Sequence, residues 1–174
     1  MLRKIGLRKI GLRKIGLRNI GLLLIAMLWV SAAAAEGFTV VDTKGKKHHL
    51  QNYKGKWVLV NFWATWCPPC LEEMPDLQKL HETRKDLVVI GIAMDYKDPS
   101  YVISFADDLL VTFPIVLGDQ EIAAQFGRIN GLPTTYLYSP QGKLAAKNVG
   151  ALTRQAVERY IDQWHASSKS PAQK

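Results

Sequence analysis

Cys67 and Cys70 are the two cysteines of the chain and stand three residues apart in the stretch WATWCPPCLEEMP. A pair at this spacing can close a disulfide, contribute to a metal site or exchange electrons with another disulfide. A passive disulfide around two residues would add little stability, because the gain grows with the size of the enclosed loop. A zinc site needs further ligands, and the four histidines lie at no zinc-finger spacing. The pattern therefore favours a redox-active pair over a structural disulfide or a metal site.

Both cysteines are expected at the start of a helix. An apolar run rich in β-formers, Trp57–Trp63, precedes them, and a helical stretch follows from Cys67 to about Glu82. Pro68 and Pro69 fit the first turn, because the N–H groups there have no helical partner. The free amides and the dipole at this end of a helix stabilise a thiolate. Cys67 is therefore the candidate nucleophile, and the two prolines shape the turn that presents it.

Glu73, one helical turn after Cys70, is a further candidate for chemistry. At about 100° per residue, Glu73 falls between Leu77 and Leu80 on the apolar arc of the predicted helix. Glu72 falls on the side that faces water. A carboxyl group on an apolar face is expected to have a raised pKa and to be able to transfer protons. The alternative, that Glu73 lies at the edge of the arc and reaches into solvent, remains open.

The rest of the chain predicts alternating strands and helices around this helix. The apolar runs Trp57–Trp63 and Leu87–Met94 enclose it, which makes a βαβ unit with parallel pairing. FTVVD and KKHHL flank the turn TKG and predict a hairpin before this unit. After the unit the sequence predicts a helix from Asp98 to Leu110, a strand at 113–117, a short helix at 120–127, strands at 134–138 and 143–150, and a terminal helix capped by Thr153.

Length and charge indicate a single domain without a nucleic-acid partner. The chain has 174 residues, of which 48% are hydrophobic, enough for one compact core. Its formal charge is +8, but seven of its 23 basic residues precede Glu36, which leaves 16 basic against 15 acidic residues, or +1. A nucleic-acid binder keeps its basic residues on the folded domain, where they can meet phosphates.

The first 35 residues have the pattern of an export signal. LRKIG occurs three times and LRNIG once, followed by the apolar run Ile20–Val30 and the small residues of SAAAAEG. This order predicts a signal peptide cleaved after Ala35. An uncleaved membrane anchor remains open, although the apolar stretch of about 16 residues falls short of the ~20 that span a bilayer. Residues 36–166 are then the exported domain, and 167–174 are a polar tail that is expected to be disordered.

Several motifs match a known family together. FWATWCPPC is similar to the active-site segment of thioredoxins, Pro75 falls where they carry a helix-kinking proline, and GLPTTYL resembles their cis-proline loop. The extra helix and strand between Met94 and Asp119 resemble the insertion of one subgroup. Over roughly Phe38–His165 the chain thus resembles the exported TlpA/ResA-like thiol-disulfide oxidoreductases of the thioredoxin superfamily. The resemblance implies an α/β, thioredoxin-like fold with a central mixed sheet flanked by helices, an N-terminal β-hairpin and a central helix-strand insertion.

The resemblance also implies roles for particular residues. Cys67 would attack a client disulfide, Cys70 would resolve the mixed disulfide, and Glu73 would take the Cys70 proton. Trp66 and the loop Leu132-Pro133, with a cis peptide bond, would frame the groove that docks the client. A purely packing role for Trp66 remains open. Electrons would come from a membrane thiol donor of the DsbD or CcdA type, and neither a cofactor nor a metal is required.

Three features of the sequence depart from related families. Asn61 stands six residues before Cys67, where thioredoxin has a buried aspartate, and an amide cannot take over that proton transfer. Cytochrome-maturation members carry GxxGxPE where this chain has GRINGLPTT, so apocytochrome c is one candidate client among others. Peroxiredoxins place Thr or Ser three residues before their reactive cysteine and Pro seven before it. Ala64 and Val60 occupy those positions, which disfavours peroxidase activity.

The predicted function is therefore that of an exported reductase of protein disulfides, in the periplasm or on the outer face of the cytoplasmic membrane. The dipeptide Pro68-Pro69 lacks the histidine typical of strong oxidants, so we expect a potential nearer to thioredoxin's roughly −270 mV than to DsbA's roughly −120 mV. Two alternatives remain open. The same pair could act as a disulfide oxidase or isomerase, or the fold could serve a copper-binding or scaffold protein without turnover.

Overall fold

The structure is a computed structural model that describes residues 37–169. The predicted leader, residues 1–35, and the end of the predicted tail, 170–174, lie outside the described residues. Among the described residues, no helix combines the length and the apolar character that crossing a membrane requires.

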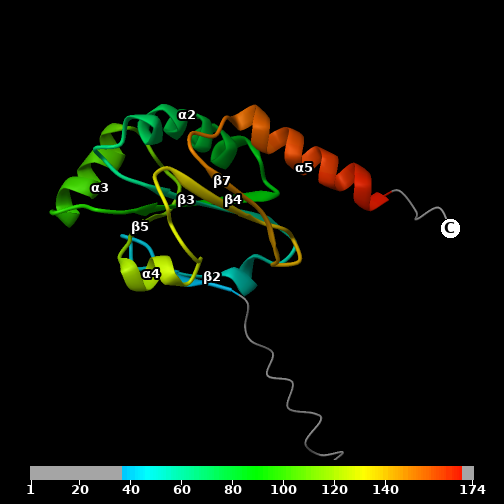
Figure 1. Ribbon diagram of the computed structural model, residues 1–174, viewed down its shortest axis with the longest axis horizontal. Coiled ribbons are helices and arrows are strands. Elements are labelled where there is room, and N and C mark those ends of the chain that lie inside the picture. Colours follow the sequence, from blue (N-terminus) through cyan, green and yellow to red (C-terminus); the bar gives the residue numbers. More distant parts are fainter. Residues whose placement is uncertain (1–36, 170–174) are drawn as a thin grey trace, which may run out of the picture. The chain divides into compact units, whose positions relative to one another are not determined.

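The helices and strands alternate as the sequence predicts (Figure 1). They are, in order, β1 (Thr39–Val41), β2 (Lys47–His49), the short 3-10 helix η1 (Leu50–Tyr53), β3 (Trp57–Trp63), α2 (Pro68–Thr83), β4 (Leu87–Ala93), α3 (Pro99–Asp108), β5 (Ile115–Leu117), α4 (Gln120–Ala124), β6 (Thr134–Tyr138), β7 (Leu144–Val149) and α5 (Arg154–Lys169). The strand β5 starts later than predicted. Pro114 has no N–H to donate to a strand ladder, which explains why the strand begins at Ile115.

Five strands form one mixed sheet in the order β5-β4-β3-β6-β7. The strands β3, β4 and β5 are parallel, whereas β6 runs antiparallel to both β3 and β7. The hairpin β1-β2 is a separate antiparallel pair. The predicted α/β fold, with its mixed sheet, N-terminal hairpin and helix-strand insertion of α3 and β5, is thus confirmed. The strand β3 lies between β4 and β6, so its carboxyl end has a strand on either side.

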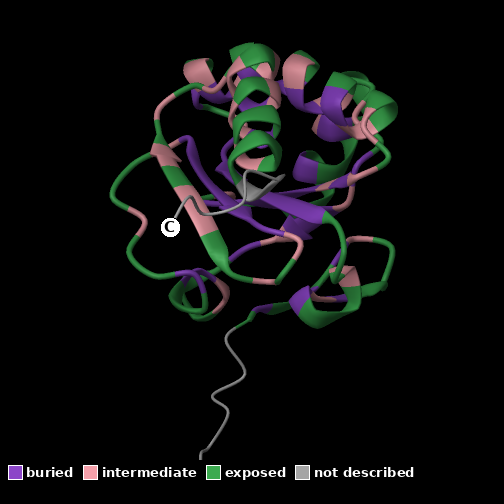
Figure 2. Ribbon diagram, turned by 90° about the vertical axis from the view of Figure 1, so that its right-hand side faces the viewer, coloured by how far each residue is buried: buried purple, intermediate pink, exposed green. Residues whose placement is uncertain are grey.

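Helices α2, α3 and α5 cover one face of the sheet, and the hairpin, η1 and α4 cover the other (Figure 1). Figure 2 shows the central strands buried between these two layers. Every residue of β3 is buried, as its continuous apolar run predicts. Alternate side chains of β3 enter the two cores: Trp57, Leu59 and Trp63 pack on the α2 side, and Val58, Val60 and Phe62 pack with the hairpin. Asn61 is the polar exception on the α2 side.

The terminal helix is longer than predicted. Thr153 caps it, since its Oγ1 accepts a hydrogen bond from the Ala156 N–H at 3.3 Å. The helix continues to Lys169, past His165 and into the segment predicted as a disordered tail. No glycine or proline interrupts the sequence before Pro171, so the residues after His165 can extend the helix. The described part of the predicted tail is therefore helical.

Candidate active site

Cys67 and Cys70 lie where β3 gives way to α2, and they form a disulfide with a Cα–Cα distance of 5.3 Å. Cys67 is the N-cap of α2, and Pro68 and Pro69 occupy its first turn. The Cys67 carbonyl accepts the N–H of Cys70 at 3.0 Å and that of Leu71 at 3.2 Å. Cys67 is 3% exposed and Cys70 is fully buried. The pair therefore lies at the start of the helix, as the sequence predicts. Cys67 is the more exposed of the two cysteines.

Trp66, next to the outer cysteine, lies on the surface and is 61% exposed. Its indole N–H donates a 3.2 Å hydrogen bond to the carbonyl oxygen of Asp95. Asp95 follows β4 and has a φ of 53°, in the left-handed region. A cleft of about 390 Å³ lies beside Trp66 and is lined by Thr65, Trp66, Asp95, Tyr96, Lys97, Asp98 and Tyr101. Trp66 is thus available to a partner and does not pack inside the core.

The peptide bond between Leu132 and Pro133 is cis, as predicted. Thr134, the next residue, pairs with Phe62 across β6 and β3. Since Phe62 lies near the carboxyl end of β3, the Pro133 loop lies at the same end of the sheet as the cysteines. A second cleft of about 420 Å³ reaches from Met94 and Asp95 to Leu132. Asp95 lines both clefts. The two clefts therefore lie next to the residue whose carbonyl accepts the Trp66 hydrogen bond.

Glu73 is buried, with 3% of its surface exposed, which excludes the solvent-facing alternative. Its Oε1 accepts a 2.6 Å hydrogen bond from Asn61 Nδ2, and its Oε2 accepts one of 2.7 Å from the Leu152 N–H. Burial raises the pKa of Glu73 to about 7, although the hydrogen bonds from Leu152 and Asn61 act in the opposite direction. Glu72, by contrast, is exposed. A carboxyl with a pKa near neutrality, one turn from Cys70, can accept and return a proton.

Asn61 and Thr135 complete this cluster, and the sequence did not reveal their part in it. Asn61 is fully buried, and its Nδ2 also donates a 3.1 Å hydrogen bond to Thr135 Oγ1. The two residues pair across β3 and β6, so their side chains share one face of the sheet. Asn61 Oδ1 has no hydrogen-bond partner among the described residues. The signal available in the sequence was an asparagine inside the otherwise apolar run WVLVNFW.

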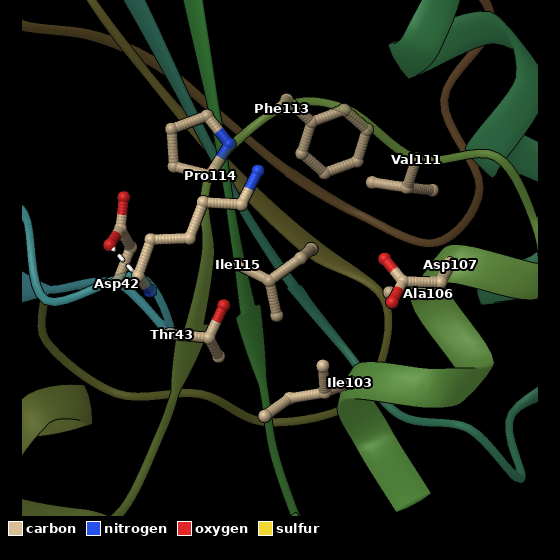
Figure 3. Close-up of a pocket in the computed structure, with 10 residues that line it drawn as sticks. Asp42, Thr43, Ile103, Ala106, Asp107, Val111, Phe113, Pro114 and Ile115 are labelled. Carbon is tan, nitrogen blue, oxygen red and sulfur yellow. Dashed lines mark hydrogen bonds between the residues drawn. The ribbon is translucent and has the colours of Figure 1, made fainter. Parts of the chain in front are cut away.

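A second buried polar cluster lies at the hairpin β1-β2, where Asp42 bridges Val116 of the edge strand β5. His48 pairs through Nε2 with Asp42 Oδ2 at 2.9 Å and through Nδ1 with the Tyr53 hydroxyl. Asp42 Oδ1 accepts the N–H groups of Lys44 and Lys46, and it borders a cavity of about 130 Å³ between the hairpin, α3 and the start of β5 (Figure 3). Within residues 37–169, no three His, Cys, Asp or Glu side chains gather in a way that could hold a metal ion. His48 is buried and hydrogen-bonds to Asp42 and Tyr53 within this end of the chain.

Comparisons with known proteins agree with this geometry. The chain matches the AhpC/TSA family over residues 31–147. It is 34% identical over 131 residues to the thiol-disulfide oxidoreductase ResA of Geobacillus kaustophilus, and the match covers 75% of each chain. It is 37% identical over 131 residues to the thioredoxin-like protein YneN of Bacillus subtilis, which covers 74% of this chain and 76% of the relative. A solved structure, a thiol:disulfide interchange protein of the thioredoxin family from Chlorobium tepidum, matches with a TM-score of 0.66 and 28% identity over 73% of this chain and 92% of that one.

Proposed function

Since the chain belongs to the AhpC/TSA family and to the ResA-like thiol-disulfide oxidoreductases of the thioredoxin superfamily, we propose that it reduces disulfides in client proteins. Its relatives include the thiol-disulfide oxidoreductase ResA of Geobacillus kaustophilus. The observation that supports the reducing direction is the Pro68-Pro69 dipeptide, which lacks the histidine of strong oxidants. Ala64 and Val60 replace the residues that peroxiredoxins carry, so we propose exchange between thiols and disulfides and not peroxide reduction.

The proposed reaction uses the outer sulfur first. The Cys67 thiolate attacks the client disulfide, one client sulfur leaves, and a mixed disulfide forms. Cys70 passes its proton to Glu73 and displaces the second client sulfur, which closes the Cys67–Cys70 disulfide. Two electrons thereby move from the cysteine pair to the client. Trp66 and the Leu132-Pro133 loop would dock the client at the clefts on either side of Asp95.

The place of the reaction and its partners belong to the same proposal. The leader pattern supports export to the periplasm or to the outer face of the cytoplasmic membrane, with a membrane tether if the leader is retained. Outside the cytoplasm a reductase needs a supply of electrons, which a membrane thiol donor of the DsbD or CcdA type would provide. Apocytochrome c, whose cysteines must be reduced before haem attachment, is a suitable client.

A redox titration of the purified full chain tests this function. We expect the Cys67–Cys70 couple nearer to roughly −270 mV than to roughly −120 mV, together with reduction of insulin disulfides. Cys70→Ala should abolish turnover and trap clients as mixed disulfides with Cys67. A potential above about −160 mV would instead support an oxidase or isomerase. Tight stoichiometric binding of Cu(I) without insulin reduction would support the copper-binding alternative.

A further inference from the structure

The cleft beside Trp66 has an aromatic lining. Its volume is about 390 Å³, and three of its seven lining residues carry aromatic rings, namely Trp66, Tyr96 and Tyr101. Trp66 and Tyr101 are exposed, with 53% exposure for Tyr101, and Tyr96 is half-buried. The second cleft, which reaches to Leu132, has no aromatic residue in its lining. Accessible rings therefore distinguish the α3 side of the active site from the side of the cis-proline loop.

Two of these rings are fixed by contacts with the rest of the domain. The Trp66 indole N–H donates to the Asp95 carbonyl at 3.2 Å. The Tyr101 ring packs on Phe105 with 5.7 Å between the ring centroids, and Phe105 stacks on the buried Trp63 at 6.4 Å. Tyr101 is therefore supported from the core although its own ring is exposed. A side chain that enters the cleft would meet rings that are already in position, which favours binding.

The charged residues of the cleft are Asp95, Lys97 and Asp98, and all three are exposed. Asp98 Oδ1 accepts the Ser100 N–H at 2.9 Å at the start of α3, and the hydrogen bonds from Ser100 hold the pKa of Asp98 below its usual 3.8. Two carboxylates and one ammonium give the lining a net charge of −1. Among the residues that the structure describes, neither Asp95 nor Asp98 takes part in an ion pair. Both carboxylates are therefore available to a cation from another molecule.

We propose that this cleft binds a lysine or arginine side chain of the client, close to the cysteine that Cys67 attacks. The proposal rests on the proposed function, in which the client is a protein with a disulfide. The face of an aromatic ring attracts a cation, and the two carboxylates add a second attraction of the same sign. An apolar side chain would use the rings alone, and an acidic side chain would be repelled. The client class is thus disulfide proteins with a basic residue beside the reactive cysteine.

The position of the cleft defines where this basic residue lies in the client. Trp66 lines the cleft and directly precedes Cys67 in the chain, so their Cα atoms are about 3.8 Å apart. An extended client segment advances about 3.3 Å per residue. When the client cysteine lies at Cys67, a side chain within about three residues of it can therefore reach the cleft.

Four disulfide-bonded peptides test the proposal, identical except for a lysine, glutamine, leucine or glutamate beside the cysteine. Stopped-flow kinetics with the reduced full chain give a rate constant for the reduction of each peptide. Each value is divided by the rate constant with dithiothreitol, because neighbouring charges change the reactivity of a disulfide by themselves. We expect the lysine peptide to react about tenfold faster than the glutamine peptide. This preference should shrink at about 1 M salt, where the Debye length is about 3 Å.

Variants of the cleft test which residues cause the preference. Tyr101→Leu and Asp98→Asn should each lower it about threefold. Asparagine is as good an N-cap as aspartate, so Asp98→Asn removes the charge and keeps the start of α3. Asp108→Asn is the matched control, because Asp108 is an exposed acid of the same helix that does not line the cleft. It changes the net charge equally and should keep the preference, including any part that comes from the Cys67 thiolate. Lys97→Gln should increase the preference.

The outcomes separate the cleft from the proposed function. Equal normalised rates for the lysine and glutamine peptides, or a faster leucine peptide, would overturn the proposal and leave the reductase function intact. An equal loss of preference in Asp98→Asn and Asp108→Asn would also overturn it, because the overall charge would then explain the effect. Reduction of none of the peptides would remove the proposed function. Tryptophan fluorescence of the disulfide form with peptides that carry serine for cysteine then decides on the cleft: tighter binding of the lysine peptide would support it, and equal binding would exclude it.

Discussion

Asn61 and Glu73 share a 2.6 Å hydrogen bond from amide to carboxylate, and neither side chain is more than 3% exposed. The amide donates to the ionised acid and adds no charge of its own. Among the described residues, Glu73 is thus the single buried acid on the α2 side of the sheet.

Asn61→Asp would place a second carboxyl group beside Glu73. Two buried acids at this distance cannot both ionise without repulsion, so the pair should titrate in two separated steps, one of them above the pKa of about 7 of Glu73. Acids with raised pKa values stabilise the fold least at high pH. We expect a loss of about 2 kcal/mol or more in urea unfolding at pH 8 and a smaller loss at pH 5. Asn61→Leu adds no charge but removes the amide donor that lowers the Glu73 pKa, so it should show a dependence on pH of the same sign and of smaller size.

Glu73→Gln should slow disulfide exchange and flatten its pH dependence between pH 6 and 9 without unfolding the domain. Glutamine keeps the shape of the side chain but cannot accept the proton of Cys70. Loss of a positioned general base typically costs about 10²-fold or more in rate. Stopped-flow exchange rates measure the effect, and Glu72→Gln is the control because Glu72 is exposed. Equal rates for Glu73→Gln and the wild type would show that Glu73 has no part in the exchange.

The same substitution should change the stability profile. The pKa of Glu73 is about 7 in the folded protein against an ordinary 4.5, because burial disfavours the charged form. The contribution of Glu73 to the free energy of unfolding should therefore be fully present below pH 4.5. It should be lost as the pH rises through 7. At pH 8 the loss is on the order of 3 kcal/mol. Chemical denaturation at pH 5 and pH 8 measures the free energy of unfolding, and Glu73→Gln should not show this decrease between the two pH values.

Asp42→Ala should destabilise the hairpin β1-β2 without changing the redox potential of the Cys67–Cys70 couple. Burial alone would raise the pKa of Asp42, but the hydrogen bonds from His48, Lys46 and Lys44 outweigh it and hold the pKa below its usual 3.8. The ionised Asp42 thus stabilises the fold above pH 3.8, and this contribution is lost as pH falls through the lowered value. We expect a loss of about 2 kcal/mol at pH 7 that shrinks in acid. Asp107→Ala, which changes an exposed acid of the same cavity, should be nearly neutral.

Gly118→Ala should be strongly destabilising, because a Cβ at Gly118 would lie 2.5 Å from Ile92 Cγ2 and from Met94 Sδ and 2.9 Å from the Ala93 carbonyl. The carbonyl cannot move without breaking the 2.8 Å hydrogen bond that it accepts from the Gly118 N–H. Overpacking of this kind costs about 1–3 kcal/mol. Thermal unfolding measures it, with Gly131→Ala as control, since a Cβ there meets nothing within 4 Å. Similar melting temperatures of the two variants would contradict the expectation.

Much of the fold was predictable because local patterns and tertiary packing agree. The run Trp57–Trp63 is buried on both faces and therefore carries the signal of a central strand without ambiguity. Burial of Glu73 followed from its helical position, since the arc of α2 that holds Leu77 faces the sheet. The partners of Glu73 were not predictable in this way. Thr135 and Leu152 lie 74 residues or more from the groups that they bind, and no local period encodes such a contact.

From those long-range hydrogen bonds we expect an order in which the parts of the site form during folding. The βαβ unit of β3, α2 and β4 is built from contacts close in sequence, which form early because short loops close at little entropic cost. Glu73 contacts Leu152 across 79 residues, so it meets its backbone donor only after β6, β7 and the segment before α5 have docked. A chain that has folded only its first half therefore carries Cys67 and Cys70 with a solvated, ordinary glutamate beside them. We therefore expect the raised pKa of Glu73 to appear only with the last part of folding, after the cysteines themselves are in place.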